Sequence, residues 1–172
     1  MQREEILRRR IKACTGILIL GLVISGATAI PLVSEVEWLV KVTSANDVAG
    51  SGKSLSPAWA AWPLNVQAAL QSVARDRAFL FYGTDWLAFG HFAIALAFVG
   101  ALRDPVRNIW LFTFGMIACA LVVPYAFVFG AVRGIPVWWR LIDCSFGVVG
   151  IIPLWLCRTW SKSLELRPNE TH

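Results

Sequence analysis

Five polar residues near the ends and middle of apolar segments are the side chains of this sequence best placed to do chemistry. They are Tyr82, Asp85 and His91 in one segment and Arg140 and Asp143 in another. Carboxylate, guanidinium, imidazole and phenol groups can bind a charged ligand or pass a proton between them. Because an ionisable group is costly to bury at membrane depth, each is a functional candidate by default. We therefore treat the five as a candidate ligand-binding site or proton relay.

His91 lies near the middle of the apolar stretch 79–102. In a purely structural interpretation, its imidazole forms a hydrogen bond to a neighbouring helix. It follows Asp85 by six residues, which is about 9 Å along a helix and about 120° around it, so the two do not face each other. The sequence predicts no particular cofactor. Ligation of a haem or chlorin by His91 alone stays open, since the only other histidine is His172 at the chain end.

The charged members of the site have a second interpretation as an ion-pair staple between helices. Arg140 and Asp143 are three residues apart at the start of the fourth apolar segment, and Asp85 is near the start of the second. If these two helices are neighbours, the arginine can pair with both carboxylates. The other interpretation is a small polar pocket that opens toward the outer side of the membrane and binds a substrate or relays protons.

Familiar catalytic and nucleotide-binding signatures are missing from the sequence. No Gly-x-Ser-x-Gly elbow, metal-ligand motif or dinucleotide fingerprint occurs. The segment GSGKS at 50–54 resembles part of a phosphate loop, but Asp47 stands where the first glycine is needed. We assign no catalytic residue and no metal ligand, and we favour a non-catalytic protein over an enzyme.

The four cysteines do not suggest a disulfide framework or a zinc site. They are Cys14, Cys119, Cys144 and Cys157. Each lies in or beside an apolar run, and none forms a Cys-x-x-Cys pair. We expect them to be small buried side chains.

The composition of the whole chain is that of a membrane protein. Hydrophobic residues make up 57% of the 172 residues and charged residues 16%, and the mean hydropathy is +0.61. Charged residues make up about 25% of ordinary soluble domains. The net charge is +5, but the basic residues cluster at the ends of apolar runs, so we expect no nucleic-acid partner.

Four apolar runs are long enough, or nearly so, to cross a bilayer as helices. They cover residues 14–33, 79–102, 109–132 and 141–157. We predict an all-α integral membrane protein that forms one transmembrane domain over residues 1–172, a bundle of four spanning helices. The first is expected to bend near Pro31, and Asp104 followed by Pro105 is expected to start the third.

The hydrophilic segment 34–78 is predicted to carry one amphipathic helix. Trp59, Trp62, Val66, Leu70 and Val73 recur at spacings of three and four residues. Ser56 and Pro57 are a plausible start for this helix, and Pro63 is a possible break in it. A helix with tryptophan on its apolar side is typical of the membrane interface, so we expect it to lie on the outer surface.

The distribution of lysine and arginine predicts which side of the membrane each end faces. With the N-terminus inside, ten of the 16 basic residues are cytoplasmic, in agreement with the positive-inside rule. Four spans then place both termini in the cytoplasm. The predicted location is the plasma (inner) membrane, as a multi-pass protein.

The function best supported by these features is that of a small accessory or assembly subunit of a larger membrane complex. Small residues at Ala93, Ala97 and Ala101, and at Gly147 and Gly150, let helices approach closely, either within the chain or to a partner. The expected partners are the lipid bilayer and either another membrane protein or a second copy of this chain. The alternative is a small transport or ligand-binding protein that uses Asp85, Arg140, Asp143 and His91.

Overall fold

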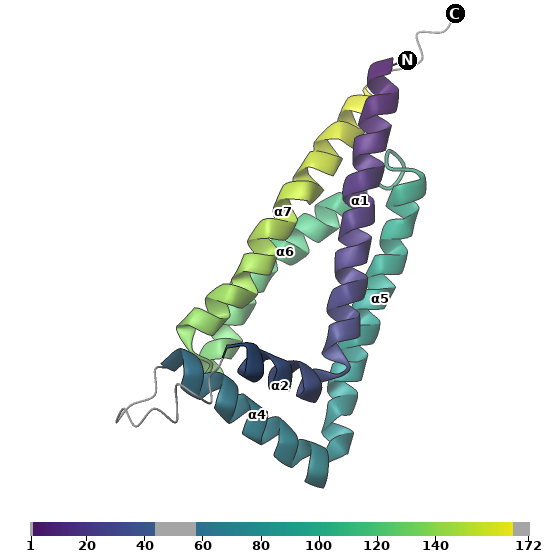
Figure 1. Cartoon of the computed structure of the whole chain (residues 1–172). Helices are drawn as coiled ribbons and strands as arrows, with labels where there is room; N and C mark the ends of the chain where they lie inside the picture. Colours follow the sequence, from purple (N-terminus) through teal and green to yellow (C-terminus); the bar gives the residue numbers. More distant parts are fainter. Residues whose placement is uncertain (1, 44–57, 167–172) are drawn as a thin grey trace, which may run out of the picture. The chain divides into compact units, whose positions relative to one another are not determined.

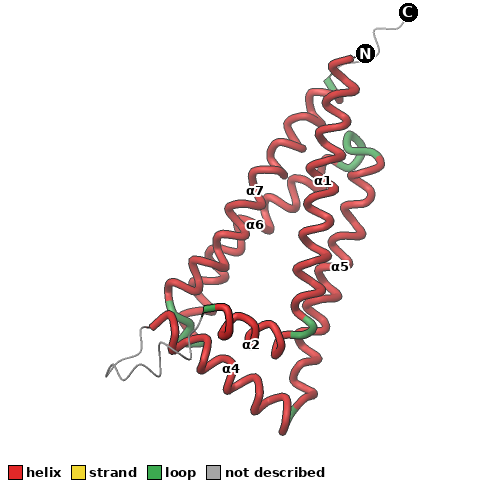
Figure 2. Tube along the Cα trace, viewed as in Figure 1, coloured by secondary structure: helices red, strands yellow, loops and turns green. Residues whose placement is uncertain are grey.

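The computed structural model describes residues 2–43 and 58–166, and every regular element in those ranges is helical (Figure 2). The helices are α1 (Gln2–Ala29), α2 (Leu32–Val42), α4 (Ala58–Asp76), the 3₁₀ turn η1 (Ala78–Phe81), α5 (Tyr82–Arg103), α6 (Ile109–Val132) and α7 (Val137–Glu165) (Figure 1). The segment 50–54 and the proposed helix start at Ser56 and Pro57 lie outside the described residues.

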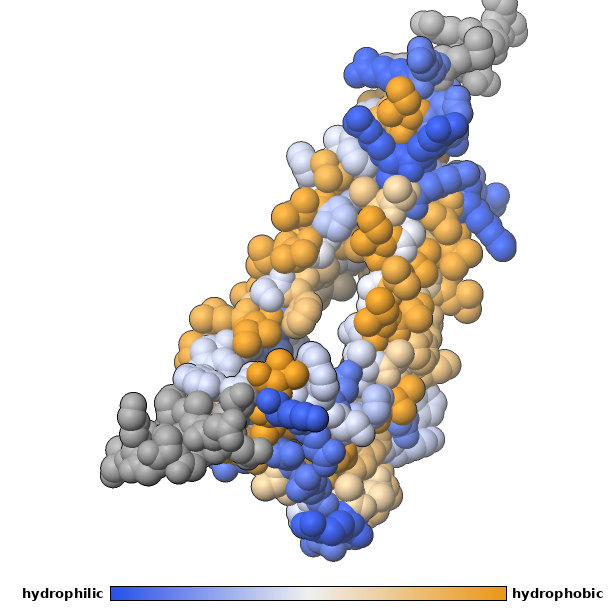
Figure 3. All heavy atoms as spheres, in the orientation of Figure 1, coloured by the Kyte–Doolittle hydropathy of each residue, from blue (hydrophilic) through white to orange (hydrophobic). Residues whose placement is uncertain are grey.

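Four stretches of helix are long and apolar enough to cross a membrane, as predicted. They are Gln2–Ala29, Ala78–Arg103, Ile109–Val132 and Val137–Glu165. The first and last are longer than the apolar runs. In the first, the added turns carry two ion pairs at i and i+4, Glu4 with Arg8 and Glu5 with Arg9. Figure 3 shows apolar side chains along the flanks of the spanning helices and hydrophilic ones around the start of α1.

The chain breaks between α1 and α2 at Pro31. Helix α1 ends at Ala29, and α2 begins at Leu32. Proline has no N–H to continue the α1 hydrogen-bond ladder, but its carbonyl accepts from Glu35 N at 3.0 Å and so begins α2. The predicted bend near Pro31 is therefore a full break between two helices.

The described residues divide into two compact units, residues 23–92 and the remainder. In the unit formed by residues 1–22 and 93–172, a hydrophobic core joins the first half of α1 to the end of α5, the start of α6 and the end of α7 (Figure 1). Its buried residues are Ile11, Phe98, Ala101, Leu111, Phe112, Leu154, Cys157 and Leu164. This packing places the start of α1 beside the end of α7.

Helices α6 and α7 form a tightly packed antiparallel hairpin. A Cβ atom on Gly147 would lie 2.6 Å from the carbonyl oxygen of Cys119, so only glycine allows the two backbones to come this close. Arg158 Nε also donates to Thr113 Oγ1 at 2.9 Å. The small residues predicted for the fourth span therefore serve packing within the chain.

The turn between α6 and α7 is a Schellman motif, which ends α6. Gly134 has φ +67°. Ile135 N donates to Gly130 O at 2.8 Å, and Gly134 N donates to Ala131 O at 3.2 Å. Pro136 follows and precedes the first residue of α7. The left-handed conformation explains why glycine stands at this position.

The turn between α5 and α6 differs from the sequence prediction. Asp104 Oδ1 accepts from Arg107 N at 3.1 Å, so it caps the turn at 105–108 and not α6, which begins at Ile109. Asn108 Nδ2 donates to Gly100 O at 3.1 Å and to Asp104 O at 2.9 Å. The asparagine side chain thus satisfies carbonyls at the end of α5.

The unit of residues 23–92 contains α2 and α4, which pack against each other. Val40 and Ala60 are buried between them, with Val36 and Leu64 at the edge of the contact, and Gln71 Nε2 donates to Glu37 Oε1 at 2.8 Å. The predicted helix in segment 34–78 is confirmed as α4, and it continues through Pro63. A second helix, α2, occupies part of the same segment.

Candidate functional site

The five predicted site residues belong to two different units. Tyr82, Asp85 and His91 are on the first half of α5, within residues 23–92, while Arg140 and Asp143 are on the first turns of α7. Each group is described within its own unit. The predicted meeting of Asp85 with Arg140 and Asp143 stays a prediction.

Tyr82 and Asp85 stand in the first turn of α5, directly after η1. Both side chains are exposed. The Tyr82 ring meets Trp86 edge-on, with centroids 6.0 Å apart, and Trp86 meets Phe89 at 5.5 Å. Among the described residues of this unit, Asp85 forms no ion pair. The carboxylate therefore lies beside a row of aromatic rings, a combination typical of the boundary between hydrocarbon and water.

His91 is held in one tautomer by its own helix. Its Nδ1 lies 2.8 Å from Leu87 O. Because a carbonyl oxygen only accepts, the imidazole must carry a proton on Nδ1, which leaves Nε2 as the nitrogen that can meet a ligand. Histidines that ligate metals are commonly oriented by such a bond to the backbone. Within the described residues no three His, Cys, Asp or Glu side chains gather at a metal site, so His91 would be a single protein ligand.

His91 also lies at a helix crossing. A Cβ atom on Gly26 of α1 would be 3.0 Å from the Cβ of His91 and 2.9 Å from Cε1 of Phe92. The imidazole is partly buried there. This placement gives His91 a packing role between α1 and α5, whereas its hydrogen bond goes to Leu87 of its own helix and not to a neighbouring helix as expected.

Arg140 is engaged by the α6–α7 turn. Its Nε donates to Ile135 O at 2.7 Å, and its Cδ lies 2.6 Å from the position that a Cβ on Gly130 would take. The guanidinium therefore satisfies a carbonyl just after the Schellman motif. Sequence reasoning missed this role, since the partner carbonyl belongs to a turn whose shape is not encoded by the arginine itself.

Asp143 is the least satisfied member of the group. It is partly buried on α7, and in the described part of its own unit it has neither a hydrogen bond nor an ion pair. The nearby Ser145 hydroxyl donates to Ile142 O at 2.6 Å. The carboxylate oxygens of Asp143 are therefore open to solvent or to a partner from outside this unit.

Two polar contacts at the other end of α7 were not predicted. Thr15 and Cys157 are fully buried, with Thr15 Oγ1 and Cys157 Sγ 3.9 Å apart. The Cys157 thiol also donates to Ile11 O at 3.9 Å. Cys144 is buried as well, so the prediction of buried cysteines is confirmed for these two, whereas Cys14 and Cys119 are only partly buried.

Comparison with family models, with curated proteins and with solved structures finds no match for this chain. Its function is therefore argued from its own residues.

Proposed function

We propose that this chain is a non-catalytic integral membrane protein, a small accessory or assembly subunit of a larger membrane complex. The observation that carries the proposal is an unfilled face of small residues on α5. This face consists of Gly90, Ala93 and Ala97.

Helix α5 has two opposite sides with different surroundings. Ala88 and Ala95 are buried against the rest of the chain. At 100° per residue, Gly90, Ala93 and Ala97 lie about 140–160° around the helix from Ala95. Ala93 and Ala97 are exposed, and nothing lies within 4 Å of the position of a Cβ on Gly90. The small-residue face thus points away from the buried side of the helix.

Contact with lipid alone does not explain why small residues occupy this face. Large apolar side chains make up much of the exposed surface of the spans, such as Leu96 beside this face. Small residues at four-residue spacing are typical of interfaces where another transmembrane helix approaches closely. Only 17–22% of the most apolar window of each span is buried within the chain. The spans therefore offer ample surface to a membrane partner.

The proposal includes the orientation and surroundings of the chain. The start of α1 and the end of α7 lie together, with basic residues around them, which supports placing both on the cytoplasmic side of the plasma (inner) membrane. Helix α4 would lie in the outer interface. Its exposed Trp59 suits that position.

Site-specific photocrosslinking in native membranes tests the proposal. A photoreactive p-benzoylphenylalanine in place of Ala93 or Ala97 is expected to yield one discrete larger adduct, which mass spectrometry then identifies. The same probe in place of Ile117 or Val128, two lipid-exposed residues of α6, serves as the matched control and is expected to give no discrete adduct.

The outcome separates the possible partners. An adduct with a different membrane protein supports a subunit of a complex, whereas an adduct with a second copy of the chain indicates a homo-oligomer. A chain that gives no adduct and is extracted in mild detergent as a stable monomer contradicts the proposal. An absorption spectrum of the same purified peak tests His91 for a haem or chlorin.

The partly buried Asp143 favours a second candidate, a small transport or ligand-binding protein. A carboxylate without a partner in its own unit can accept from a substrate or a proton carrier. In this candidate Asp85, Arg140 and Asp143 form the outward pocket, and His91 lies deeper. A colourless monomer without partners is the result that would favour it.

A further inference from the structure

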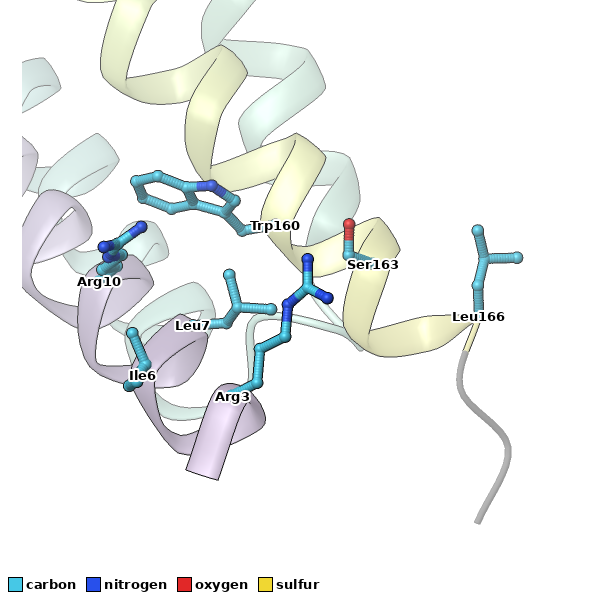
Figure 4. Close-up of a pocket in the computed structure, with 7 residues that line it drawn as sticks. All are labelled: Arg3, Ile6, Leu7, Arg10, Trp160, Ser163 and Leu166. Atoms are coloured by element: carbon cyan, nitrogen blue, oxygen red, sulfur yellow. The ribbon is translucent and has the colours of Figure 1, made fainter. Parts of the chain in front are cut away.

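A pocket of about 600 Å³ lies between the first turns of α1 and the last turns of α7 (Figure 4). Both segments belong to the same compact unit. On α1 the pocket is lined by Arg3, Leu7 and Arg10, which share one helix face at spacings of four and three residues. On α7 it is lined by Trp160 and neighbouring residues of the last two turns.

The positive charges of α1 are divided between two faces. Arg8 and Arg9 are paired with Glu4 and Glu5, at 3.0 Å in each case. By contrast, neither pocket arginine has a carboxylate within 4.0 Å in the part of the chain that the structure describes. Among the described residues, two guanidinium groups without a paired carboxylate therefore border one cavity. An anion between them would relieve their repulsion and accept charge-assisted hydrogen bonds.

The remaining lining is mostly apolar. The guanidinium carbon of Arg10 lies 6.0 Å from the centre of the Trp160 ring, a cation–π contact. Leu7 and Leu166 add aliphatic surface. Ser163 donates its hydroxyl proton to Thr159 O at 3.0 Å, so the strong donors facing the pocket are the arginines. The pocket combines cationic donors with an apolar wall, which suits an amphiphile better than a small hydrophilic anion.

The end of the pocket nearest the apolar runs, at Arg10 and Trp160, lies at the depth of the headgroup layer of a bilayer. Arg10 is four residues before Cys14, where the charge-free run of α1 begins, which is about 6 Å along the helix. Trp160 is three residues after Cys157, the end of the last apolar run, or about 4.5 Å. The layer between hydrocarbon and water is of this thickness, and tryptophan is enriched there.

We propose that this pocket binds the phosphate headgroup of an anionic phospholipid. The Arg3 and Arg10 guanidinium groups hold the phosphate oxygens, for which their planar fork is suited. Trp160, at the end of the pocket nearest the apolar run, contacts the glycerol. Basic pockets between transmembrane helices are established sites for anionic lipids.

Native mass spectrometry of the full-length protein in mild detergent tests this. The probes are phosphatidylglycerol, phosphatidylcholine and inorganic phosphate. We expect phosphatidylglycerol to bind at least tenfold more tightly than phosphatidylcholine. The double variant Arg3→Gln/Arg10→Gln is expected to lose at least tenfold in phosphatidylglycerol affinity. The double variant Arg8→Gln/Arg9→Gln removes the same formal charge outside the pocket and should change the affinity less than threefold.

Three results would overturn the proposal. An equal loss in both double variants would show a general effect of surface charge. Equal affinity for phosphatidylcholine would remove the requirement for an anionic headgroup. Displacement of the lipid by millimolar inorganic phosphate would assign the pocket to a free anion. If the Arg3→Gln/Arg10→Gln variant does not fold, the variant Arg3→Lys/Arg10→Lys is used instead. It keeps both positive charges but lacks the planar guanidinium groups, and we expect it to bind phosphatidylglycerol several-fold more weakly than the parent.

Discussion

At the scale of single residues, Arg140 is a charged side chain that has both a functional and a structural interpretation. Its position next to an apolar span marks it as a candidate for function. In the structure its Nε donates to the Ile135 carbonyl and its aliphatic part packs on Gly130. A structural role is therefore present whether or not the residue also binds a ligand.

Replacing Arg140 measures how much of its role is structural. We expect Arg140→Gln to lower the free energy of unfolding by about 1–3 kcal/mol, because it removes a hydrogen bond from a charged donor. The measurement is unfolding in detergent followed by circular dichroism. Arg133→Gln, at an exposed position in the same turn, is the control and should change stability by less than about 0.5 kcal/mol. Equal stability of both variants would contradict the structural role.

At the scale of elements, the α6–α7 hairpin depends on close contact between two backbones. Three glycines alternate across it: Gly115 faces Leu154, Gly147 faces the Cys119 carbonyl, and Gly130 faces Arg140. In a membrane there is little hydrophobic gain from joining two helices, so dispersion contacts at short distance contribute much of the stability. The hairpin is therefore sensitive to added volume.

The hairpin predicts a contrast between two glycine substitutions. Gly147→Ala places a Cβ 2.6 Å from a carbonyl oxygen, which must push the helices apart, and we expect a loss of about 1–3 kcal/mol. Gly21→Ala on α1 meets no atom within 4 Å, and we expect it to be neutral or slightly stabilising, by up to about 1 kcal/mol. Thermal unfolding of the two purified variants gives the comparison. A Gly147→Ala variant as stable as the parent would disprove the close packing.

At the scale of the whole molecule, an even number of spans would keep the two ends of the chain on one side of the membrane. The start of α1 packs beside the end of α7, as Ile11 and Leu164 of the same core show. The predicted excess of basic residues on the inside would place this end of the unit in the cytoplasm.

Reporter fusions test this orientation. Alkaline phosphatase, which is active only outside the cytoplasm, is expected to be active when inserted between residues 45 and 55 and inactive after residue 172. Green fluorescent protein, which becomes fluorescent only inside, should give the opposite pattern. The reverse result at both sites would invert the topology. Phosphatase activity at both sites, or at neither, would contradict the three spans expected between them.

Much of the fold follows from the sequence because the relevant signals are local. The length and hydropathy of a segment decide whether it can span a bilayer. The four spans and the break at Pro31 are therefore predictable, and the bounds of α6 match the prediction to the residue. The start of α1 shifted outward, where Glu4 and Glu5 pair with Arg8 and Arg9, whereas its end shifted inward to Ala29, before Pro31.

The candidate site was predictable only as a set of residue types. That Asp85, His91, Arg140 and Asp143 are unusual follows from their chemistry and their place in apolar segments. What each contacts depends on residues elsewhere in the chain: Gly26 reaches His91 from α1, and Ile135 engages Arg140 from a turn.

Only the tertiary structure decided which groups the small residues and the charged side chains contact. Nothing in the sequence pairs Gly147 with the Cys119 carbonyl, or sets Arg3 and Arg10 against Trp160, because these residues are between 28 and 157 positions apart in the sequence. The sequence determined four helices that are long and apolar enough to span a membrane, since the length and hydropathy of each helix are set by its own residues. The close contact between α6 and α7 and the basic pocket could not be predicted from the sequence, because contact between distant residues depends on how whole helices pack.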